Sequence, residues 1–226
     1  HEGSLQFNIK RYPKAYEALR AGIFDPQELA SQGIESTFIP TLIHETTHSA
    51  LSKSFTGAYT EEGRGAYGSK LLKHVVENSP QFGNIVSKQL KSRALSVLSS
   101  GAANEVLGGI QGVPAEEINS KVEEAIGSFT FGKKSLSDAS LSHVEKAARD
   151  ILVTAFEEIL ATITEAVVGI STGTGITNKT KEFHDSLSGY ERGKLLELAR
   201  AGNTQQYFPF SSKGAGRYAS DDDDDD

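Results

Sequence analysis

The sequence contains no cysteine, no methionine and no tryptophan among its 226 residues. The absence of cysteine excludes disulfide bonds, thiolate zinc sites, iron–sulfur clusters and a cysteine nucleophile. The longest apolar runs, such as residues 166–170, are too short to cross a bilayer, and the N-terminus lacks the pattern of a signal peptide. With 37% hydrophobic and 23% charged residues, the composition is that of a globular protein, and we expect one domain over residues 1–219.

Charge is distributed unevenly along the chain. The net charge of −7 comes mostly from the six consecutive aspartates 221–226, which repel one another and are expected to belong to a disordered acidic tail over residues 220–226. Without these six, 24 of the 30 acidic residues remain against 23 Lys and Arg. The basic residues form small, scattered clusters such as Lys133 and Lys134. We therefore expect no nucleic-acid partner, and the short apolar runs predict no membrane partner.

Helix signals dominate the pattern. Prolines at helix starts, glycines after helix ends and apolar spacing predict helices over residues 26–31, 41–54, 69–78, 84–99, 114–126, 138–168 and 188–201. Asp138 is the expected N-cap of the longest helix, and Gly169 is its expected end. Residues 33–38 are expected to form a short strand, 57–68 a glycine-rich loop and 171–181 a loop or a hairpin. The predicted fold class is mainly α, with a small sheet at most.

The pentapeptide His44-Glu45-Thr46-Thr47-His48 is the strongest chemical signal. On a helix, residues four apart lie on one face with about 5–6 Å between their Cβ atoms, so the two imidazoles can bind one metal ion. Zn²⁺ with imidazole and carboxylate ligands keeps an open position for a water molecule and lowers its pKa to about 7. The spacing therefore predicts Zn²⁺ on His44 and His48, with Glu45 as the general base that takes the proton of this water.

A catalytic zinc site needs a third protein ligand, and the predicted helix over residues 138–168 offers carboxylates. At about 100° per residue, the apolar residues of this helix fall in one broad sector. Glu157 points away from the sector, Glu158 lies at its border, and Glu165 lies beside Glu158 two turns on. A carboxylate at the border of a core-facing stripe can emerge into a cleft. Glu158 is therefore the preferred third ligand, and Glu165 is the reserve.

Three other histidines are distributed along the chain at positions 74, 143 and 184. His74 shares a predicted helix with Glu77, and His74 or His184 is an alternative third ligand. His184, which Asp185 follows, can also orient a substrate or a ligand. His143, near a helix start, is expected to be structural or exposed.

The segment Thr41-Leu-Ile-His-Glu-Thr-Thr-His-Ser-Ala50 resembles the active-site helix of the zincin metallopeptidases. Within that group the likeness is to the gluzincins, whose third zinc ligand is a glutamate on a later helix. Glu158-Ile-Leu-Ala161 is similar to the E-x-x-A element that carries this glutamate in toxin-type and phage-associated zincins. The resemblance implies that His44, His48 and Glu158 are the zinc ligands and that Glu45 is the general base.

The resemblance also shapes what is expected of the rest of the chain. Relatives often carry an acidic residue directly after that alanine; here it is Thr162, so the supporting acidic residue is either absent or replaced by Glu165. The long span between the two motifs implies a helical insertion over residues 70–135, which is a candidate specificity lid or assembly surface. Because the chain has no methionine at position 1, we expect a processed piece of a larger protein, such as a phage or toxin polyprotein.

Zincins usually place a tyrosine or a histidine across from the attacking water to stabilise the oxyanion. Tyr59, Tyr67 and Tyr190 are available, and Tyr67 is preferred because it lies in the glycine-rich segment that follows the predicted active-site helix. Gly63, Gly65 and Gly68 also fit G-x-G-x-x-G, but no strand precedes them and no acidic residue follows at the spacing a ribose requires. Nucleotide binding is therefore not expected.

The sequence favours a zinc-dependent metallopeptidase that hydrolyses peptide bonds of a peptide or protein substrate. The alternative from another class is a non-catalytic structural or delivery protein, for example a phage virion component, that retains a zincin fold. The presence of Glu45 favours the peptidase, since a degenerate site would be free to lose it.

Overall fold

The computed structural model describes residues 8–23, 25–53, 61–78, 86, 89–90, 92–94, 96, 115–130 and 133–201. The regular elements of this described part are helices, without a strand: α1 (Pro13–Arg20), α2 (Pro26–Ser31), α3 (Phe38–Lys53), α4 (Glu61–Asn78), α7 (Ala115–Thr130), α8 (His143–Thr172), α9 (Asn178–Ser186) and α10 (Gly189–Ala201). The mainly α prediction is confirmed. The strand expected over residues 33–38 is wrong: these residues form turns and coil up to Phe38, where α3 begins.

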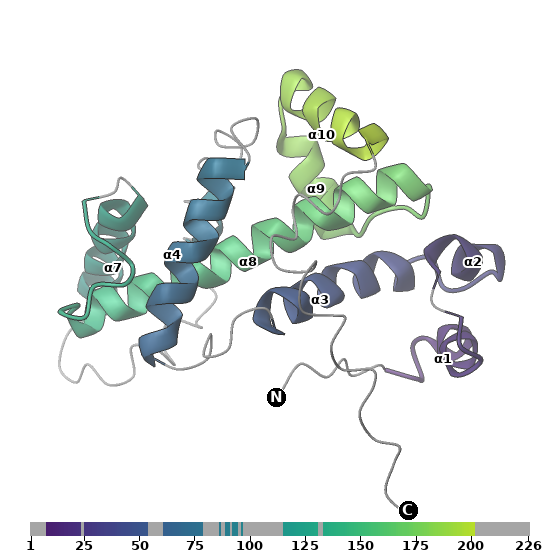
Figure 1. Ribbon diagram of the computed structural model, residues 1–226, viewed down its shortest axis with the longest axis horizontal. Coiled ribbons are helices and arrows are strands. Elements are labelled where there is room, and N and C mark those ends of the chain that lie inside the picture. Colours follow the sequence, from purple (N-terminus) through teal and green to yellow (C-terminus); the bar gives the residue numbers. More distant parts are fainter. Residues whose placement is uncertain are drawn as a thin grey trace, which may run out of the picture.

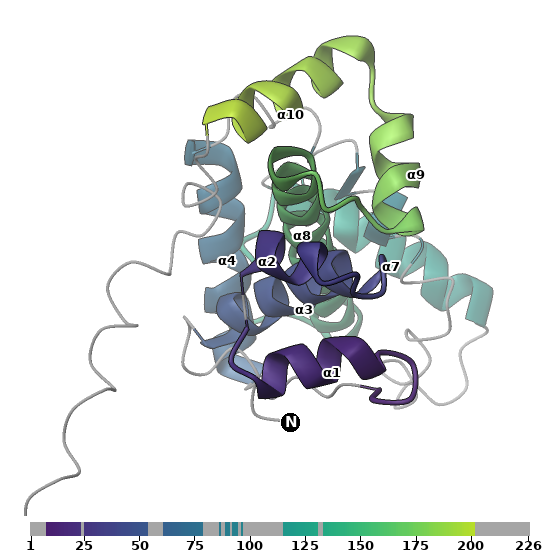
Figure 2. The same ribbon diagram turned by 90° about the vertical axis from the view of Figure 1, so that its right-hand side faces the viewer.

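The 30-residue helix α8 is the central element (Figure 1). It contacts α3, α4, α7, α9 and α10, and the view turned by 90° shows these helices arranged around it (Figure 2). Its sequence is apolar over much of its circumference, and most of its residues from Ala147 to Val167 are buried. A helix that is hydrophobic nearly all round must be covered on several sides, which explains its position.

The ends of α8 differ from the prediction. Its N-cap is Ser142, not Asp138: the Ser142 hydroxyl accepts from the backbone N–H of Glu145, whose carboxylate accepts from the Ser142 N–H, which is a complete capping box. At the other end the helix continues through Gly169 to Thr172, and Gly173 closes it in the left-handed conformation with φ 69°.

Gly169 serves close packing instead of termination. A Cβ at this position would lie 2.2 Å from the carbonyl oxygen of Gly175, in the segment that turns back from α8. This turn leads into α9, a helix that the sequence analysis missed. Thr177 is its N-cap, and its hydroxyl accepts from the N–H of Thr180. The sequence did not predict α9, because this short helix has few apolar residues and the segment around its N-cap is polar and rich in glycine.

The glycine-rich loop expected over residues 57–68 is wrong where the structure describes it, because residues 61–68 are the first turns of α4. The glycines allow close approach between elements. A Cβ on Gly65 would lie 2.5 Å from the carbonyl oxygen of Leu136, and one on Gly68 would lie 2.5 Å from Cγ2 of Val153 on α8. Close packing of α4 therefore requires glycine at Gly65 against the segment before α8 and at Gly68 against α8 itself.

Other helix predictions are confirmed with shifted ends. Helix α2 matches its predicted bounds, and α3 begins three residues before the predicted start. Helix α7 extends past the predicted end at residue 126, through Gly127 to Thr130. The capping box at the start of α10 is present, since the Ser188 hydroxyl accepts from the N–H of Glu191. Most of the helix predicted over residues 84–99, and the acidic tail, lie outside the described residues.

Helix α3 joins the two hydrophobic clusters of the molecule. Its first turns, with Phe38 and Ile39, pack with α1 and α2 in the smaller cluster. Its last turn contributes Leu51 to the main cluster around α8. Apolar contacts at both ends therefore fix the middle of α3, which carries the histidine pair, beside α8.

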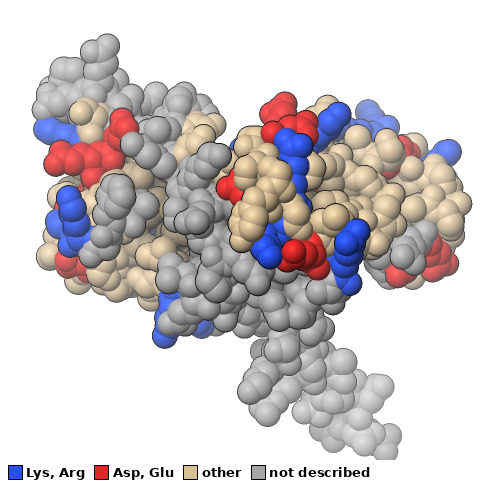
Figure 3. Space-filling model, turned by 90° about the horizontal axis from the view of Figure 1, so that it is seen from above, with Lys and Arg blue, Asp and Glu red and all other residues tan. Residues whose placement is uncertain are grey.

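The surface of the described residues agrees with a near-neutral body. In Figure 3, basic and acidic side chains are interspersed over the described part of that face. Within this part of the chain, no helix combines the length and the apolar character that crossing a membrane requires.

Alanine at Gly65 should lower the free energy of unfolding by about 1–3 kcal/mol, because the new methyl group meets a backbone carbonyl that cannot turn away. The control is Gly127→Ala, inside α7, where a Cβ meets nothing within 4 Å and alanine should stabilise the helix by about 0.5–1 kcal/mol. Urea unfolding followed by circular dichroism measures both changes. Equal effects of the two substitutions would contradict the packing role of Gly65.

Candidate metal centre

The packing of α3 against α8 brings three predicted ligands together. His44 and His48 lie one turn apart on α3, and Glu158 faces them from α8. Their ligand atoms all lie within 4.8 Å of one another, so this group can hold a metal ion. Sequence reasoning selected these three residues, which lie together although 110 positions separate His48 from Glu158.

The separations within the cluster match what a tetrahedral ion requires. The Nε2 atoms of His44 and His48 are 3.3 Å apart, and His48 Nε2 is 3.3 Å from Oε1 of Glu158. His44 Nε2 is 3.9 Å from Oε2 of Glu158. Ligand atoms about 2.0–2.1 Å from a tetrahedral Zn²⁺ lie about 3.3 Å from each other. One small ion can therefore contact all three side chains after a shift of a few tenths of an ångström.

Glu165 supports the cluster from behind His44. Its Oε2 lies 3.1 Å from Nδ1 of His44, and its Oε1 accepts from the backbone N–H of Thr177 at 2.6 Å. The carboxylate requires hydrogen on Nδ1, which leaves the Nε2 lone pair of the neutral imidazole facing the cluster. Glu165, the reserve ligand, is thus a contact of His44 Nδ1 and not a member of the three-residue group.

The cluster is electrostatically asymmetric. Burial lowers the pKa of His48, but the hydrogen bond to Glu158 and the charges of Glu158, Glu157 and Glu45 outweigh burial and raise this pKa above 6.5. The hydrogen bond with His48 is the largest influence on Glu158; burial opposes it, and Lys179 adds to it, so the pKa of Glu158 lies far below its usual value. Without metal, His48 and Glu158 therefore form a hydrogen-bonded pair in which each side chain favours the charged form of the other.

Glu165 also ionises readily. Burial, the largest influence, raises its pKa, but the hydrogen bonds from His44 and from Thr177 and Thr180 together lower it. Its side chain is only 1% exposed. A buried carboxylate that remains charged because its partners satisfy it gives His44 a fixed orientation.

Lys179, on α9, is a site residue that sequence reasoning missed. Its ammonium group contacts Oε2 of Glu158, while Oε1 faces His48. No signal in the sequence pointed to it, because the helix that carries it was not predicted. Lys179 therefore links α9 to the ligand Glu158.

Tyr67 and Glu157 form a second contact between α4 and α8. The Tyr67 hydroxyl donates to Oε1 of Glu157 at 2.6 Å, and Arg64 lies 3.7 Å from the same oxygen. Arg64 also donates to the Thr154 hydroxyl at 3.0 Å. Glu157 does not point to solvent as its helical position suggested, because α4 covers it. Tyr67 is fully buried, and its role in stabilising an oxyanion stays a prediction.

Glu45 lies on the exposed side of α3, next to the ligand His44. The side chains of His48 and Glu158 are 24% and 25% exposed, so one side of the cluster reaches solvent. Glu45 acts on the cluster through its charge, which raises the pKa of His48. Glu45 and part of the three-residue cluster are therefore both exposed to solvent.

The alternative ligands lie elsewhere or are not described. The side chain of His74 lies outside the described residues. His184 lies on α9 with its Nδ1 3.6 Å from Asp185, and His143, the first residue of α8, is exposed as expected. Among the described residues, the metal-binding group consists of His44, His48 and Glu158.

Comparison of the chain with protein-family models, with curated proteins and with solved structures finds no match. The interpretation of the site therefore depends on its geometry and on the chemistry of its side chains.

The metal-free chain should be most stable between about pH 4.5 and 6.5. The raised pKa of His48 contributes stability that is present below 6.5 and is lost as pH rises through the folded-state pKa. The lowered pKa values of Glu158 and Glu165 contribute stability that is present above 4.5 and is lost as pH falls through the folded-state values. Urea unfolding from pH 3 to 9 with a chelator measures the profile. His48→Gln should reduce the loss of stability above pH 6.5, and the exposed control His143→Gln should not. Identical pH profiles for His48→Gln and the unmodified chain would refute the pairing of His48 with Glu158.

Glu158→Ala should reduce metal binding most strongly, since it removes a ligand, and Glu165→Gln should weaken binding by about 10–100-fold because His44 loses its orienting partner. Titration with Zn²⁺ and plasma mass spectrometry of the loaded protein measure affinity, stoichiometry and the metal retained. Glu124→Gln, an exposed change on α7, is the control. If Glu158→Ala bound metal as tightly as the unmodified chain, Glu158 would not be the third ligand.

Proposed function

We propose that this chain is a zinc-dependent peptidase with His44, His48 and Glu158 as metal ligands and Glu45 as general base. The observation that supports it most strongly is the set of separations among the three ligand atoms, two of them 3.3 Å. Two imidazoles and one carboxylate are a common ligand set of catalytic zinc, which leaves a fourth position open. The partly exposed side chains of His48 and Glu158 agree with an open position.

Each side chain then has a distinct task. Zn²⁺ bound here would supply a Lewis acid and lower the pKa of a water molecule to about 7. His44 is held in one orientation by Glu165, and His48 shares the carboxylate of Glu158. Glu45 accepts a proton from the attacking water and returns it to the leaving amine, while the carbonyl carbon gains the hydroxyl group and the peptide C–N bond breaks.

The oxyanion of the tetrahedral intermediate needs a donor. We retain Tyr67 for this role, which requires its hydroxyl to turn from Glu157, the carboxylate that it now contacts at 2.6 Å. Arg64 would then remain beside Glu157 and keep its charge partnered.

A second function is favoured by one observation, the contact between Lys179 and Glu158. An ammonium group on a ligand carboxylate competes with a metal ion for the same charge. In a non-catalytic structural or delivery protein, the cluster would be a structural ion pair among α3, α8 and α9. Zinc binding separates the two functions, because the second needs no metal.

Glu45→Gln should lower the rate of hydrolysis by at least about a hundredfold, because the amide keeps the shape of Glu45 but cannot accept a proton. The variant should retain one zinc per chain. Release of fluorescent peptides from labelled casein measures hydrolysis, and plasma mass spectrometry measures zinc. Glu17→Gln, an exposed change on α1, should alter neither quantity. Loss of zinc together with activity in Glu45→Gln would contradict a purely catalytic role for Glu45, and a wild-type chain without zinc would favour the second function.

A further inference from the structure

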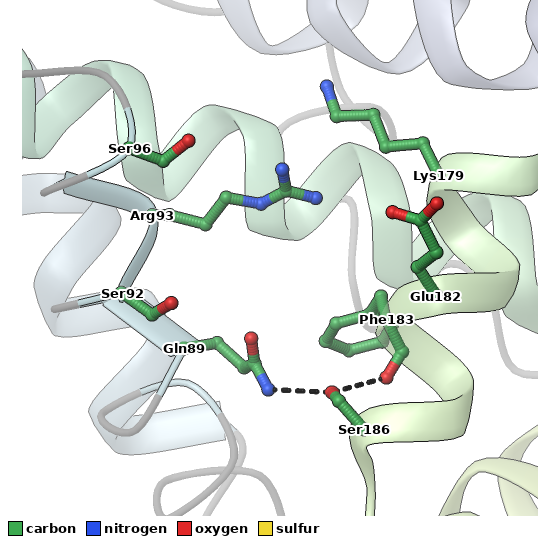
Figure 4. Close-up of a pocket in the computed structure, with 8 residues that line it drawn as sticks. All are labelled: Gln89, Ser92, Arg93, Ser96, Lys179, Glu182, Phe183 and Ser186. Atoms are coloured by element: carbon green, nitrogen blue, oxygen red, sulfur yellow. Dashed lines mark hydrogen bonds between the residues drawn. The ribbon is translucent and has the colours of Figure 1, made fainter. Parts of the chain in front are cut away.

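A polar cavity of about 210 Å³ lies between α9 and four described residues, Gln89, Ser92, Arg93 and Ser96. Figure 4 shows Gln89, Ser92 and Arg93 on one side of it and Lys179, Glu182 and Phe183 on the other. The amide of Gln89 donates to the Ser186 hydroxyl at 3.1 Å, which joins the two walls. Neither the metal cluster nor the proposed hydrolysis accounts for this cavity.

The cavity adjoins the metal cluster through one residue. Lys179 lines the cavity and also contacts Oε2 of Glu158, whose other oxygen faces His48. A peptide whose scissile bond lies at the cluster can therefore extend a neighbouring group past Lys179 into the cavity. The position is that of a specificity pocket beside the site.

Arg93 determines what this pocket can bind. Its guanidinium group extends across the cavity toward α9 in Figure 4. Within the described part of the chain, no carboxylate lies within 4.0 Å of it, so it forms no ion pair there. The planar guanidinium matches the two oxygens of a carboxylate, and serine hydroxyls beside it, such as Ser92, can add donors.

The charges around the cavity favour an anion. Arg93, Lys179 and one carboxylate, that of Glu182, line the cavity, and the Lys179 ammonium also contacts Glu158. A divalent ion on Glu158 would add positive charge at the Lys179 end. Glu182 opposes a bound anion, but it is exposed and can turn its carboxylate toward water. The same charge pattern disfavours a lysine or an arginine of a substrate near Arg93.

We propose that this cavity binds a carboxylate of the peptide substrate, with Arg93 as its principal partner and Lys179 as the second. The inference rests on the proposed peptidase function and names its substrate class: peptides with an acidic side chain, or a free C-terminal carboxylate, close to the cleaved bond. Arg93 and Lys179 are specificity-determining residues in this arrangement.

The test measures binding of fluorescein-labelled heptapeptides to zinc-loaded Glu45→Gln chain by fluorescence anisotropy. One set is amidated polyalanine with a single glutamate moved through each position, a second set has glutamine there, and a third is polyalanine with a free C-terminus. We expect one glutamate position, or the free C-terminus, to improve affinity about tenfold over the neutral counterpart. The set that gains affinity identifies a side chain or a C-terminus as the source of the carboxylate.

Second substitutions in the same chain test the cavity directly. Arg93→Gln should remove the tenfold preference, Lys179→Gln should reduce it, and Glu182→Gln should enlarge it. Lys181→Gln, an exposed change of equal charge on α9, should leave it unchanged. Circular dichroism of each variant confirms that it is folded. The preference should also shrink as salt concentration rises.

The proposal is overturned if acidic and neutral peptides bind equally, if none binds at millimolar concentration, or if the preference survives Arg93→Gln. Weaker binding in Glu182→Gln would also overturn it and indicate a cationic ligand. These outcomes differ from failure of the peptidase function, which would appear as a chain that binds no zinc. In that case the same titrations with a chelator still report whether the cavity prefers carboxylates.

Discussion

The arrangement of the site depends on one buried carboxylate, that of Glu165. Leaving a charge with 1% exposure unpaired would be costly, so the fold must supply donors to it. His44 on α3 and the backbone N–H of Thr177 before α9 are two of those donors. One side chain of α8 thereby contacts both α3, which carries the histidine pair, and the segment that leads into α9, which carries Lys179.

The regular geometry of α8 places Glu158 in the metal-binding group and Glu165 behind His44. Glu158 and Glu165 are seven residues apart, which is two turns, so both face α3 from the same side of the helix. Glu158 reaches the Nε2 atoms at the edge of the cluster, whereas Glu165 reaches Nδ1 of His44 from the interior. This division requires α3 to lie close along α8, and the hydrophobic clusters at the two ends of α3 hold it there.

The sequence predicted the helical class, most helix positions and the three residues of the metal-binding group, because helix caps and the spacing of histidines are local properties. It misassigned the glycines of α4 and Gly169, since a glycine that ends a helix and one that permits close approach to a neighbour look alike in sequence. Only the contacts of Gly65 with Leu136 distinguish them. The sequence could not predict the contact of Lys179 with Glu158 or the cavity beside Arg93, because both depend on which distant segments of the chain meet.

The two site helices are far apart in the sequence, so a metal ion that joins them would stabilise more of the fold than the site itself. His44 and Glu165 are 121 residues apart, so the unfolded chain retains the two histidines as neighbours but not the glutamates. A metal ion that prefers the native state stabilises it by mass action, about 2.7 kcal/mol at a free concentration one hundred times the dissociation constant. An ion at this site would therefore close a loop that includes α4 and α7, so metal supply would govern how often the whole α3–α8 interface opens.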